Sequence, residues 1–337
     1  MRLFPGWEVL VWAGVIMALY GVVYAVLAND IRQILGYHII SQVGYMVTGV
    51  GLGTALSLNG TAAHAYSHIL YKALLFMGAG VVLHTTGRSK LTELGGLGRH
   101  LPVTLWLFMI GAFSISGFPL FNGFISKSMI VSAAGESHRE VIMLLLLLAS
   151  VGTFLHTGLK IPVFTFWGPD SGLRPTKPPR NMLVAMAVVA GLCTFYGVYP
   201  AALYQFLPFE ADYHPYTIPH LVETVQLLTF TFIGFWVLRG KLAGEPFIAL
   251  DVDWIYRRGL RAPGRMLLDA VNASFGAAAR GRDRIVAAVV DMAQHPLRPF
   301  RPADAPRYDE NEDRLPLGTG LAITVLFLVL LAVWAAQ

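Results

Sequence analysis

The stretch HAYSHILYKALLF, residues 64–76, places two histidines and a lysine at four-residue intervals in an otherwise apolar segment. In an α-helix, steps of four turn the side chain by about 40° and climb ~6 Å, so His64, His68 and Lys72 follow one slowly turning stripe. An ionisable side chain deep in a bilayer costs about 2.5–3.5 kcal/mol on insertion scales. The stripe therefore indicates a partner, a hydrated cavity or a function.

The surrounding composition makes a soluble globular protein an improbable class. The chain has 337 residues, of which 55% are hydrophobic and 13% charged. These values predict an all-α, polytopic membrane protein with about nine transmembrane helices, including a discontinuous one. The predicted spans are 8–28, 33–55, 62–84, 102–117, 119–134, 140–165, 182–206, 218–238 and 316–335. The first is too long for a removable signal peptide and is expected to stay in the mature protein.

The distribution of charged residues predicts how the chain is divided into segments. Of its 45 Asp, Glu, Lys and Arg residues, 24 fall between Arg239 and Arg314. We therefore expect a transporter core over 1–238, a cytoplasmic or lateral segment over 239–315 and a C-terminal anchor over 316–337. Apolar residues recur at helical spacing from Met266 to Ala293, which predicts one or two amphipathic helices along the membrane surface or a small cytoplasmic helical cap. Residues 296–314 read as a loop.

The basic loops predict an orientation. Lys and Arg cluster at 174–180 and again from Arg239, and such loops are usually cytoplasmic. With nine crossings, the N-terminus is then cytoplasmic and the C-terminus outside. The same number of crossings places the basic loop 88–99 on the outer side, which is contrary to the usual cytoplasmic location of Lys and Arg.

The stripe on 64–76 has several interpretations. Histidine titrates near neutral pH, and desolvation can lower the pKa of a lysine toward the same range. A row of such residues can therefore pass protons. Alternatively, the imidazoles bond to neighbouring helices and Lys72 reaches an interface. A zinc site at His64 and His68 is a weaker rival because no third ligand is near in sequence. The single Cys193 builds neither a disulfide nor a cysteine metal site.

A second lysine lies in SGFPLFNGFISKSMI, residues 116–130. Gly117, Pro119 and Gly123 predict a break in the helix, and broken helices expose backbone groups to ion sites in transporters. Lys127 is then part of an ion pathway. The alternative is a re-entrant turn with this lysine at its rim.

Two further segments carry polar residues at helical spacing. His38, Gln42 and Tyr45 share a face with Ser41 beside them, and they either line a hydrated path or join helices. His156 and Lys160 follow Thr153 on one side of the 140–165 segment; Lys160 is a relay residue or an interface anchor. Glu223 is expected near the outer interface of the membrane and needs no functional role there.

Three motifs together indicate a family. NDIRQILGYHIISQVGYM (29–46), HAYSHILYKALLF and GFPLFNGFISK (117–127) resemble, in order and spacing, the antiporter-like membrane subunits shared by Mrp-type cation/proton antiporters, respiratory complex I and membrane-bound hydrogenases. The resemblance covers roughly residues 8–206, and DVDWIYRR (251–258) is most similar to D-type Mrp subunits.

The resemblance implies roles and partners. It makes Lys72 the central proton-relay residue, connected by His64 and His68, with Lys127 leading to the exit. Relatives have about fourteen core helices, and this chain matches their second half, so a companion chain supplying the first half is expected, or a truncation. His38 and Arg32 stand where relatives commonly have serine and lysine.

The sequence thus predicts a proton-translocating antiporter-like subunit of a multisubunit complex in the inner (plasma) membrane. The proton-relay residues are His64, His68, Lys72 and Lys127, supported by His38, Gln42, Tyr45, His156 and Lys160. The expected partners are other membrane subunits, the lipid bilayer, H⁺ and either Na⁺ or K⁺, with no cofactor, metal or nucleic acid. The alternative is a non-conducting scaffold or a quinone-proximal subunit of an NADH dehydrogenase or hydrogenase; no catalytic redox site is expected in this chain.

Overall fold

The computed structural model describes residues 7–243, 254–294 and 317–335, and in them all regular secondary structure is helical apart from one isolated β-bridge. The chain separates into two units, Met1–Asp251 and Val252–Gln337. The prediction of an all-α membrane protein is confirmed. The predicted loop 296–314 lies outside the described residues.

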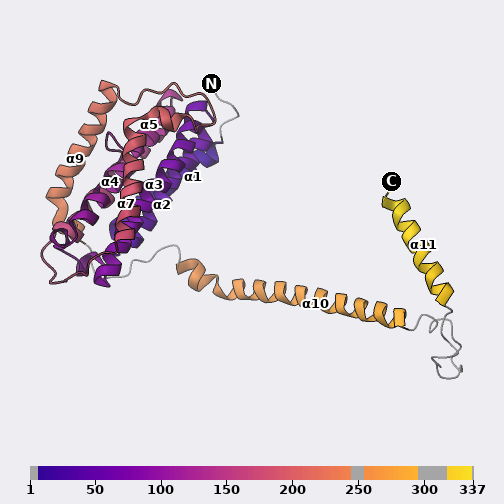
Figure 1. The fold of residues 1–337 in the computed structure, drawn as a ribbon. Helices are drawn as coiled ribbons and strands as arrows, with labels where there is room; N and C mark the ends of the chain where they lie inside the picture. Colours follow the sequence, from indigo (N-terminus) through magenta and orange to yellow (C-terminus); the bar gives the residue numbers. More distant parts are fainter. Residues whose placement is uncertain (1–6, 244–253, 295–316, 336–337) are drawn as a thin grey trace. The chain divides into compact units, whose positions relative to one another are not determined.

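The first unit is a bundle of helices around the candidate site (Figure 1). Its α-helices are α1 Glu8–Leu27, α2 Ile31–Leu52, α3 Ala55–Thr86, α4 Pro102–Ser116, α5 Asn122–Glu136, α6 Glu140–Thr153, α7 Arg180–Val198, α8 Pro200–Tyr204 and α9 Ile218–Leu242. Two 3₁₀ turns, η1 Leu91–Glu93 and η2 Leu97–Arg99, precede α4, and two π-helical segments, η3 Phe154–Lys160 and η4 Val163–Trp167, continue α6. Five described helices are long and apolar enough to cross a membrane: α1, α3, α7, α9 and the continuous Glu140–Trp167 helix.

Small residues let α1 and α2 pack closely. A Cβ added to Gly14 would lie 2.4 Å from the backbone nitrogen of Thr48, and one added to Gly44 would lie 2.5 Å from that of Ala18. In an apolar environment such close backbone approach supplies the dispersion contacts that hold helices together. This packing directs the polar face of α2 toward the bundle interior.

The start of α3 shows why the predicted 62–84 span begins too late. Gly53 adopts a left-handed conformation at φ 68° and ends α2. Thr54 then caps α3 and exchanges hydrogen bonds with Ser57, which forms a complete capping box. The helix therefore begins at Ala55, two turns before the predicted start, and carries the polar residues ahead of His64 into the bundle.

The chain breaks between α4 and α5. Gly117 ends α4 at φ +77°, and Leu120 also has a positive φ, of 75°. The two ends approach so closely that a Cβ on Gly123 would lie 1.8 Å from the carbonyl oxygen of Ser114. The Ser114 hydroxyl also bonds the Asn122 side chain.

These two short helices together make one traverse of the bundle. Ser171 donates to the Gly95 carbonyl at 3.1 Å, so the loop before α4 and the loop after η4 lie at the same end. An ion pair between Arg139 and Glu8 joins the other end, where α5 gives way to α6. The prediction that loops 88–99 and 174–180 lie on opposite sides is wrong. A 15-residue helix spans only about 22 Å, too little to cross a ~30 Å hydrocarbon layer alone.

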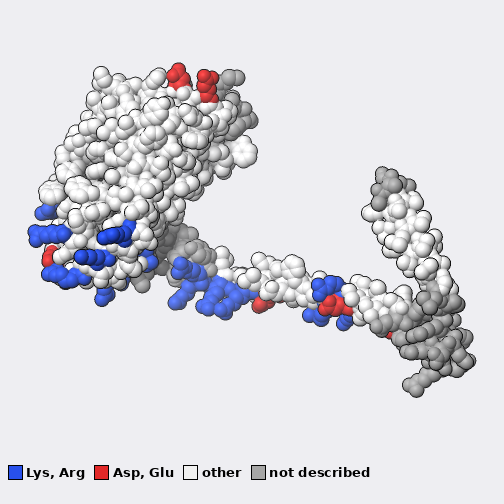
Figure 2. Space-filling view, viewed as in Figure 1, with Lys and Arg blue, Asp and Glu red and all other residues white. Residues whose placement is uncertain are grey.

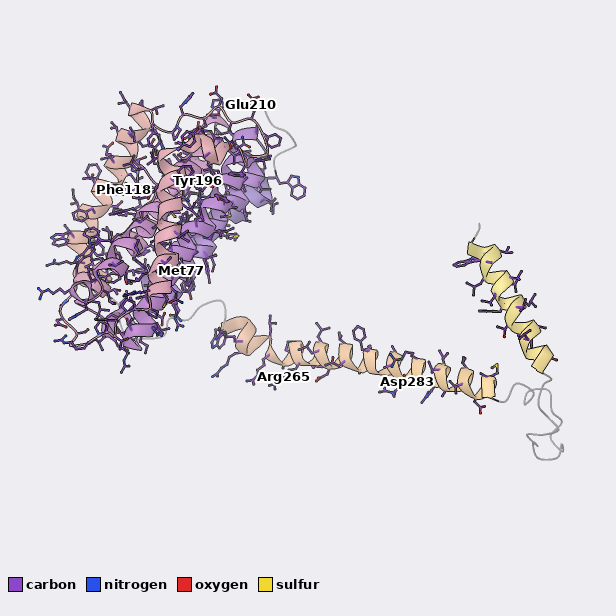
Figure 3. The ribbon with its side chains drawn as sticks, viewed as in Figure 1. Met77, Phe118, Tyr196, Glu210, Arg265 and Asp283 are labelled. Carbon is purple, nitrogen blue, oxygen red and sulfur yellow. The ribbon has the colours of Figure 1, made fainter. Side chains whose placement is uncertain are left out.

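With this correction, the two ends of the bundle differ in their prevailing charge. We call the end formed by loops 28–30, 87–101 and 168–179 and the last turn of α9 the basic end, and the end formed by loops 53–54, 137–139 and 199–217 the acidic end. Lys and Arg gather at the former, whereas Asp and Glu stand out at the latter (Figure 2). Glu210, labelled in Figure 3, lies in the loop at the acidic end.

The second unit contains η5 Ile255–Gly259, α10 Arg261–Gln294 and α11 Leu317–Ala335. The predicted amphipathic region forms one helix, α10, which is about 50 Å long at ~1.5 Å per residue. Leu267, Val271 and Phe275 share one face at four-residue spacing, and Arg265 and Asp269 lie on the opposite face.

Candidate proton relay

Three lysines are buried in the first unit. Lys72, Lys127 and Lys160 are 4%, 5% and 1% exposed. Among the described residues none of the three forms an ion pair, and each ammonium instead donates to backbone carbonyls. A buried, uncompensated charge is costly, so each of these lysines calls for a structural or functional explanation.

Lys72, from the stretch 64–76, lies against α2. Its Nζ donates to the carbonyl oxygen of Leu35 at 2.7 Å and stands 6.0 Å from the centre of the Phe76 ring. The amine thus lies buried inside the bundle, against the first turns of α2.

His64, two turns before Lys72, uses both ring nitrogens. Its Nδ1 is 3.0 Å from the Ser126 hydroxyl of α5, and its Nε2 is 3.4 Å from the Tyr71 hydroxyl on α3. The Tyr71 hydroxyl in turn lies 3.4 Å from Oε1 of Gln42 on α2, and the Gln42 amide donates to Thr153 on α6 at 3.3 Å. We call this chain of contacts the polar string. It joins α5, α3, α2 and α6 through the bundle interior.

His68 lies between His64 and Lys72 but outside the string's direct contacts. Its ring centre is 6.3 Å from that of His64 and 5.4 Å from that of Tyr71. Its buried Nε2 has no hydrogen-bond partner among the described residues. Burying a polar nitrogen without a partner costs roughly 1–3 kcal/mol, so this nitrogen requires a partner such as a water molecule.

A second imidazole pair forms where α2 meets η3. The centres of the His38 and His156 rings are 5.5 Å apart, and all four ring nitrogens are buried without a hydrogen-bond partner within the described residues. His156 lies within a π-helical segment, and such segments occur often at functional sites. Two adjacent imidazoles with unmet hydrogen bonds make this another polar, hydration-prone point of the interior.

Lys160 lies at the end of that π-helical segment. Its Nζ donates to the carbonyls of Val26 at 2.7 Å and Ala28 at 3.2 Å, which are orphan acceptors at the C-terminus of α1. A cation at this place is also favoured by the helix dipole. Lys160 is thus buried near the basic end, and the structure brings it close to His156 in the same segment.

Lys127 is held at the helix break. Its Nζ donates to the Ile115 carbonyl at 2.9 Å, near the C-terminus of α4, and to the Ser150 hydroxyl at 3.3 Å. It also stands 5.4 Å from the centre of the Tyr45 ring. The hydroxyl of Tyr45 donates to the carbonyl of Leu146, which orients that ring beneath the amine.

Lys127 also lines a small cavity of about 110 Å³, together with residues from the first turns of α9, at the acidic end. His220 and Glu223, whose side chains are 3.9 Å apart, are among them. The Glu223 side chain is 55% exposed. A titratable acid thus shares a cavity with the buried amine, which sequence spacing alone did not indicate.

Several residues of the site were absent from the sequence prediction. Tyr71 and Ser126 complete the contacts of His64, and Ser150 holds Lys127. Tyr71 lies one position before Lys72, and the apolar pattern of residues 64–76 predicts it to be a core residue. A signal existed for Ser126, which directly precedes Lys127 on a segment already predicted to be broken.

The chemistry available here is proton transfer between neutral and cationic nitrogens and hydroxyls. Imidazoles, a phenol and amines each accept and release protons, and distances of 3.0–3.4 Å along the string from Ser126 to Gln42 are within hydrogen-bond reach. Within residues 7–243, 254–294 and 317–335, no three His, Cys, Asp or Glu residues cluster closely enough to hold a metal ion.

Residues 7–155 match the family model described as NADH:quinone oxidoreductase/Mrp antiporter, TM. The matched segment contains α1 to α6, and through it the chain is similar to the antiporter-like membrane subunits. The chain is 40% identical over 160 residues to the D-type subunit of the Na(+)/H(+) antiporter of Alkalihalophilus pseudofirmus, covering 48% of this chain and 32% of that protein.

A dehydrogenase subunit and a solved antiporter complex are also similar to this chain. The chain is 32% identical over 203 residues to the L-type subunit of the F(420)H(2) dehydrogenase of Methanosarcina mazei, covering 56% of this chain and 30% of that protein. A solved structure of the Mrp complex from a Dietzia species has a similar fold, with a TM-score of 0.62, 22% identity and coverage of 89% of this chain and 35% of that one. The chain spans about a third of the length of these curated relatives.

Proposed function

We propose that this chain is a proton-translocating, antiporter-like subunit of a multisubunit membrane complex, with His64, His68, Lys72 and Lys127 as the relay. The observation that carries the proposal is the set of buried amines that have no carboxylate partner in the described part of the chain and pack around a string of proton-carrying groups. Such a set is costly to a purely structural bundle, whereas proton transfer requires groups whose charge can change.

The proposed path has two arms that meet near His64. One arm leads from Lys72 and His68 to His64, and the other from Ser126 and Lys127 into the cavity shared with Glu223. His38, Gln42, Tyr45, His156 and Lys160 support the path from α2 and η3. Water bridges the gaps, notably at the unpartnered nitrogen atoms of His38, His68 and His156.

Orientation follows from the charge separation. Because Lys and Arg favour cytoplasmic loops, we place the basic end in the cytoplasm and the acidic end, with Glu8 and Glu210, outside. The membrane is the plasma membrane, by analogy with the bacterial antiporter relatives. The proposed partners are other membrane subunits, because the relatives are themselves subunits of multisubunit complexes. The exchanged cation in this proposal is Na⁺ or K⁺.

Removing the Tyr71 hydroxyl tests the string. Tyr71→Phe keeps the ring but deletes the link between His64 and Gln42, and we expect proton movement in vesicles carrying the assembled complex to fall about tenfold. The measurement is the pH change reported by a fluorescent dye after addition of NaCl or KCl. Tyr66→Phe is the matched control, because Tyr66 lies on the same helix and bonds only Tyr196 at 3.0 Å. Equal flux in the two variants would remove the string from the path.

Cysteine labelling tests the single traverse of α4 and α5. In a Cys193→Ala background, Ser171→Cys and Ser89→Cys are expected to react with a membrane-impermeant maleimide from the same side, and Ser137→Cys from the opposite side. Ser89 and Ser171 lie in the two loops of the basic end, whereas Ser137 follows α5 at the acidic end. Labelling of Ser89→Cys and Ser171→Cys from opposite sides would restore the nine-crossing topology.

A further inference from the structure

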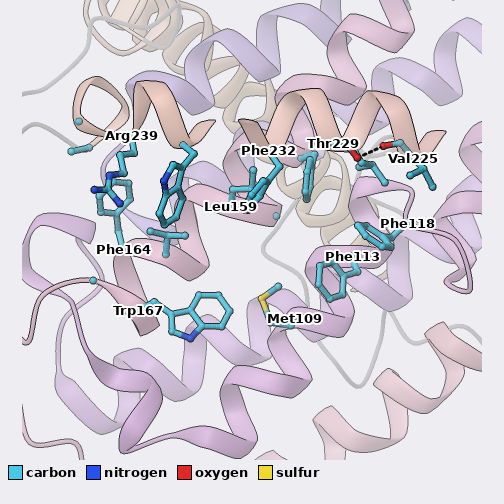
Figure 4. Close-up of a pocket in the computed structure, with 18 of the residues that line it drawn as sticks. Met109, Phe113, Phe118, Leu159, Phe164, Trp167, Val225, Thr229, Phe232 and Arg239 are labelled. Atoms are coloured by element: carbon cyan, nitrogen blue, oxygen red, sulfur yellow. Dashed lines mark hydrogen bonds between the residues drawn. The ribbon is translucent and has the colours of Figure 1, made fainter. Parts of the chain in front are cut away.

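A large apolar cavity separates α9 from α4 and the π-helical segments. Its volume is about 1000 Å³, at the upper end of the ~300–1,000 Å³ usual for ligand pockets. Phe113 and Phe118 line one side and Phe232 lines the α9 side, and Met109 and Trp167 close the wall opposite α9 (Figure 4). None of the buried lysines lines this cavity, so it is distinct from the proposed relay.

Polar groups are nearly absent from the lining. Thr229 donates its hydroxyl to the Val225 carbonyl at 2.7 Å, which leaves Arg239 as the one charged side chain among the lining residues. Water gains little from such walls, and an empty space of this size would forfeit the dispersion contacts of every side chain around it. The physical expectation is an apolar occupant.

The mouth of the cavity has the opposite character. The Arg239 guanidinium lies 4.6 Å from the centre of the Trp236 ring, and no carboxylate pairs with it within the described part of the chain. Arg239 belongs to the last turn of α9, at the basic end. An occupant that is apolar along its length and anionic at one end would satisfy both parts of the cavity.

The lining argues against an apolar protein helix as the occupant. Such a helix would fill the apolar part of the cavity but would bring no anionic partner for the Arg239 guanidinium. A quinone head would need polar partners inside the cavity, and among the described lining residues the one hydroxyl, that of Thr229, already donates to the helix backbone.

We propose that this cavity binds an anionic phospholipid, with an acyl chain between α4 and α9 and the phosphate against Arg239. In this proposal the lipid fills the cavity between α9 and α4 and stabilises the packing of α9 against η3, its principal neighbour in the bundle. The proposal does not depend on proton conduction, because the lining residues are not relay residues.

Photo-crosslinking of the assembled complex in vesicles of equal phosphatidylglycerol and phosphatidylcholine tests the proposal. A photoreactive benzoylphenylalanine at Thr229 should give lipid adducts enriched about tenfold in phosphatidylglycerol, the ratio that one charge-assisted hydrogen bond supports. The same probe at Val222, which is 58% exposed on the same helix and does not line the cavity, should report the bulk ratio. Mass spectrometry of the adducts gives both ratios.

Two variants isolate the headgroup contact. Arg239→Gln should abolish the enrichment at Thr229, whereas Lys241→Gln, at the same helix end but outside the cavity lining, should leave it unchanged. Adducts at Thr229 with another protein, with a quinone or with another segment of this chain would overturn the proposal. Equal phosphatidylglycerol ratios at Thr229 and Val222 would overturn it as well.

Discussion

Lys72→Met is expected to lower proton movement through the assembled complex by at least about a hundredfold, the usual range for a lost proton-transfer group. The amine is 4% exposed and has no ion-pair partner among the described residues, so no other charge at its position can substitute for it. Methionine has a similar length and no charge to desolvate, so folding is expected to be retained or improved.

The measurement is the dye-reported pH change in vesicles, normalised to the amount of assembled complex. Lys90→Met is the matched control, because its side chain is 60% exposed in a loop and its loss should leave the flux unchanged. A Lys72→Met complex that assembles and still moves protons at the original rate would exclude this lysine from the path. A complex that fails to assemble would contradict the expectation that the amine is not needed for folding.

Gly123→Ala is expected to disrupt the helix break and with it the position of Lys127. The added Cβ would lie 1.8 Å from the Ser114 carbonyl oxygen, and this backbone atom cannot move without shifting α4. The next carbonyl along, that of Ile115, is the acceptor for Lys127. Overpacking of this kind costs about 1–3 kcal/mol, and a displacement of the acceptor should reduce transport by an order of magnitude or more.

Thermal unfolding and vesicle transport, measured together, check this expectation. Gly191→Ala on α7 is the control, since a Cβ there meets nothing within 4 Å and alanine favours the helix. We expect a lower Tm and weaker transport for Gly123→Ala, and an unchanged or higher Tm for Gly191→Ala. Normal transport in a Gly123→Ala protein would show that the close approach of α4 and α5 is not required.

Apolar runs and breakers predicted most of the fold. Each predicted span contains a helix in the structure, because twenty or so apolar residues have few other options in a bilayer. The crossing number was harder to predict. Gly117 and Pro119 indicated a break, but composition cannot say whether two short helices cross separately or share one traverse. The contact between Ser171 and Gly95 decides it, and this contact joins residues far apart in sequence.

The candidate site could be predicted only in part, because many of its contacts also join residues far apart in sequence. The four-residue spacing of His64, His68 and Lys72 is a local property of one helix and is visible in the sequence. The contacts of His64 with Ser126, and of Gln42 with Thr153, join different helices and depend on packing. A single sequence carries no direct signal for them.

A density map of the assembled complex that resolves ordered water is the most direct test of the central claim, that buried amines and imidazoles form a hydrated path for protons. The account predicts water between the unpartnered Nε2 of His68 and Nζ of Lys72, and between the rings of His38 and His156. Close-packed hydrocarbon side chains at both places, with no water in contact with either pair, would contradict it.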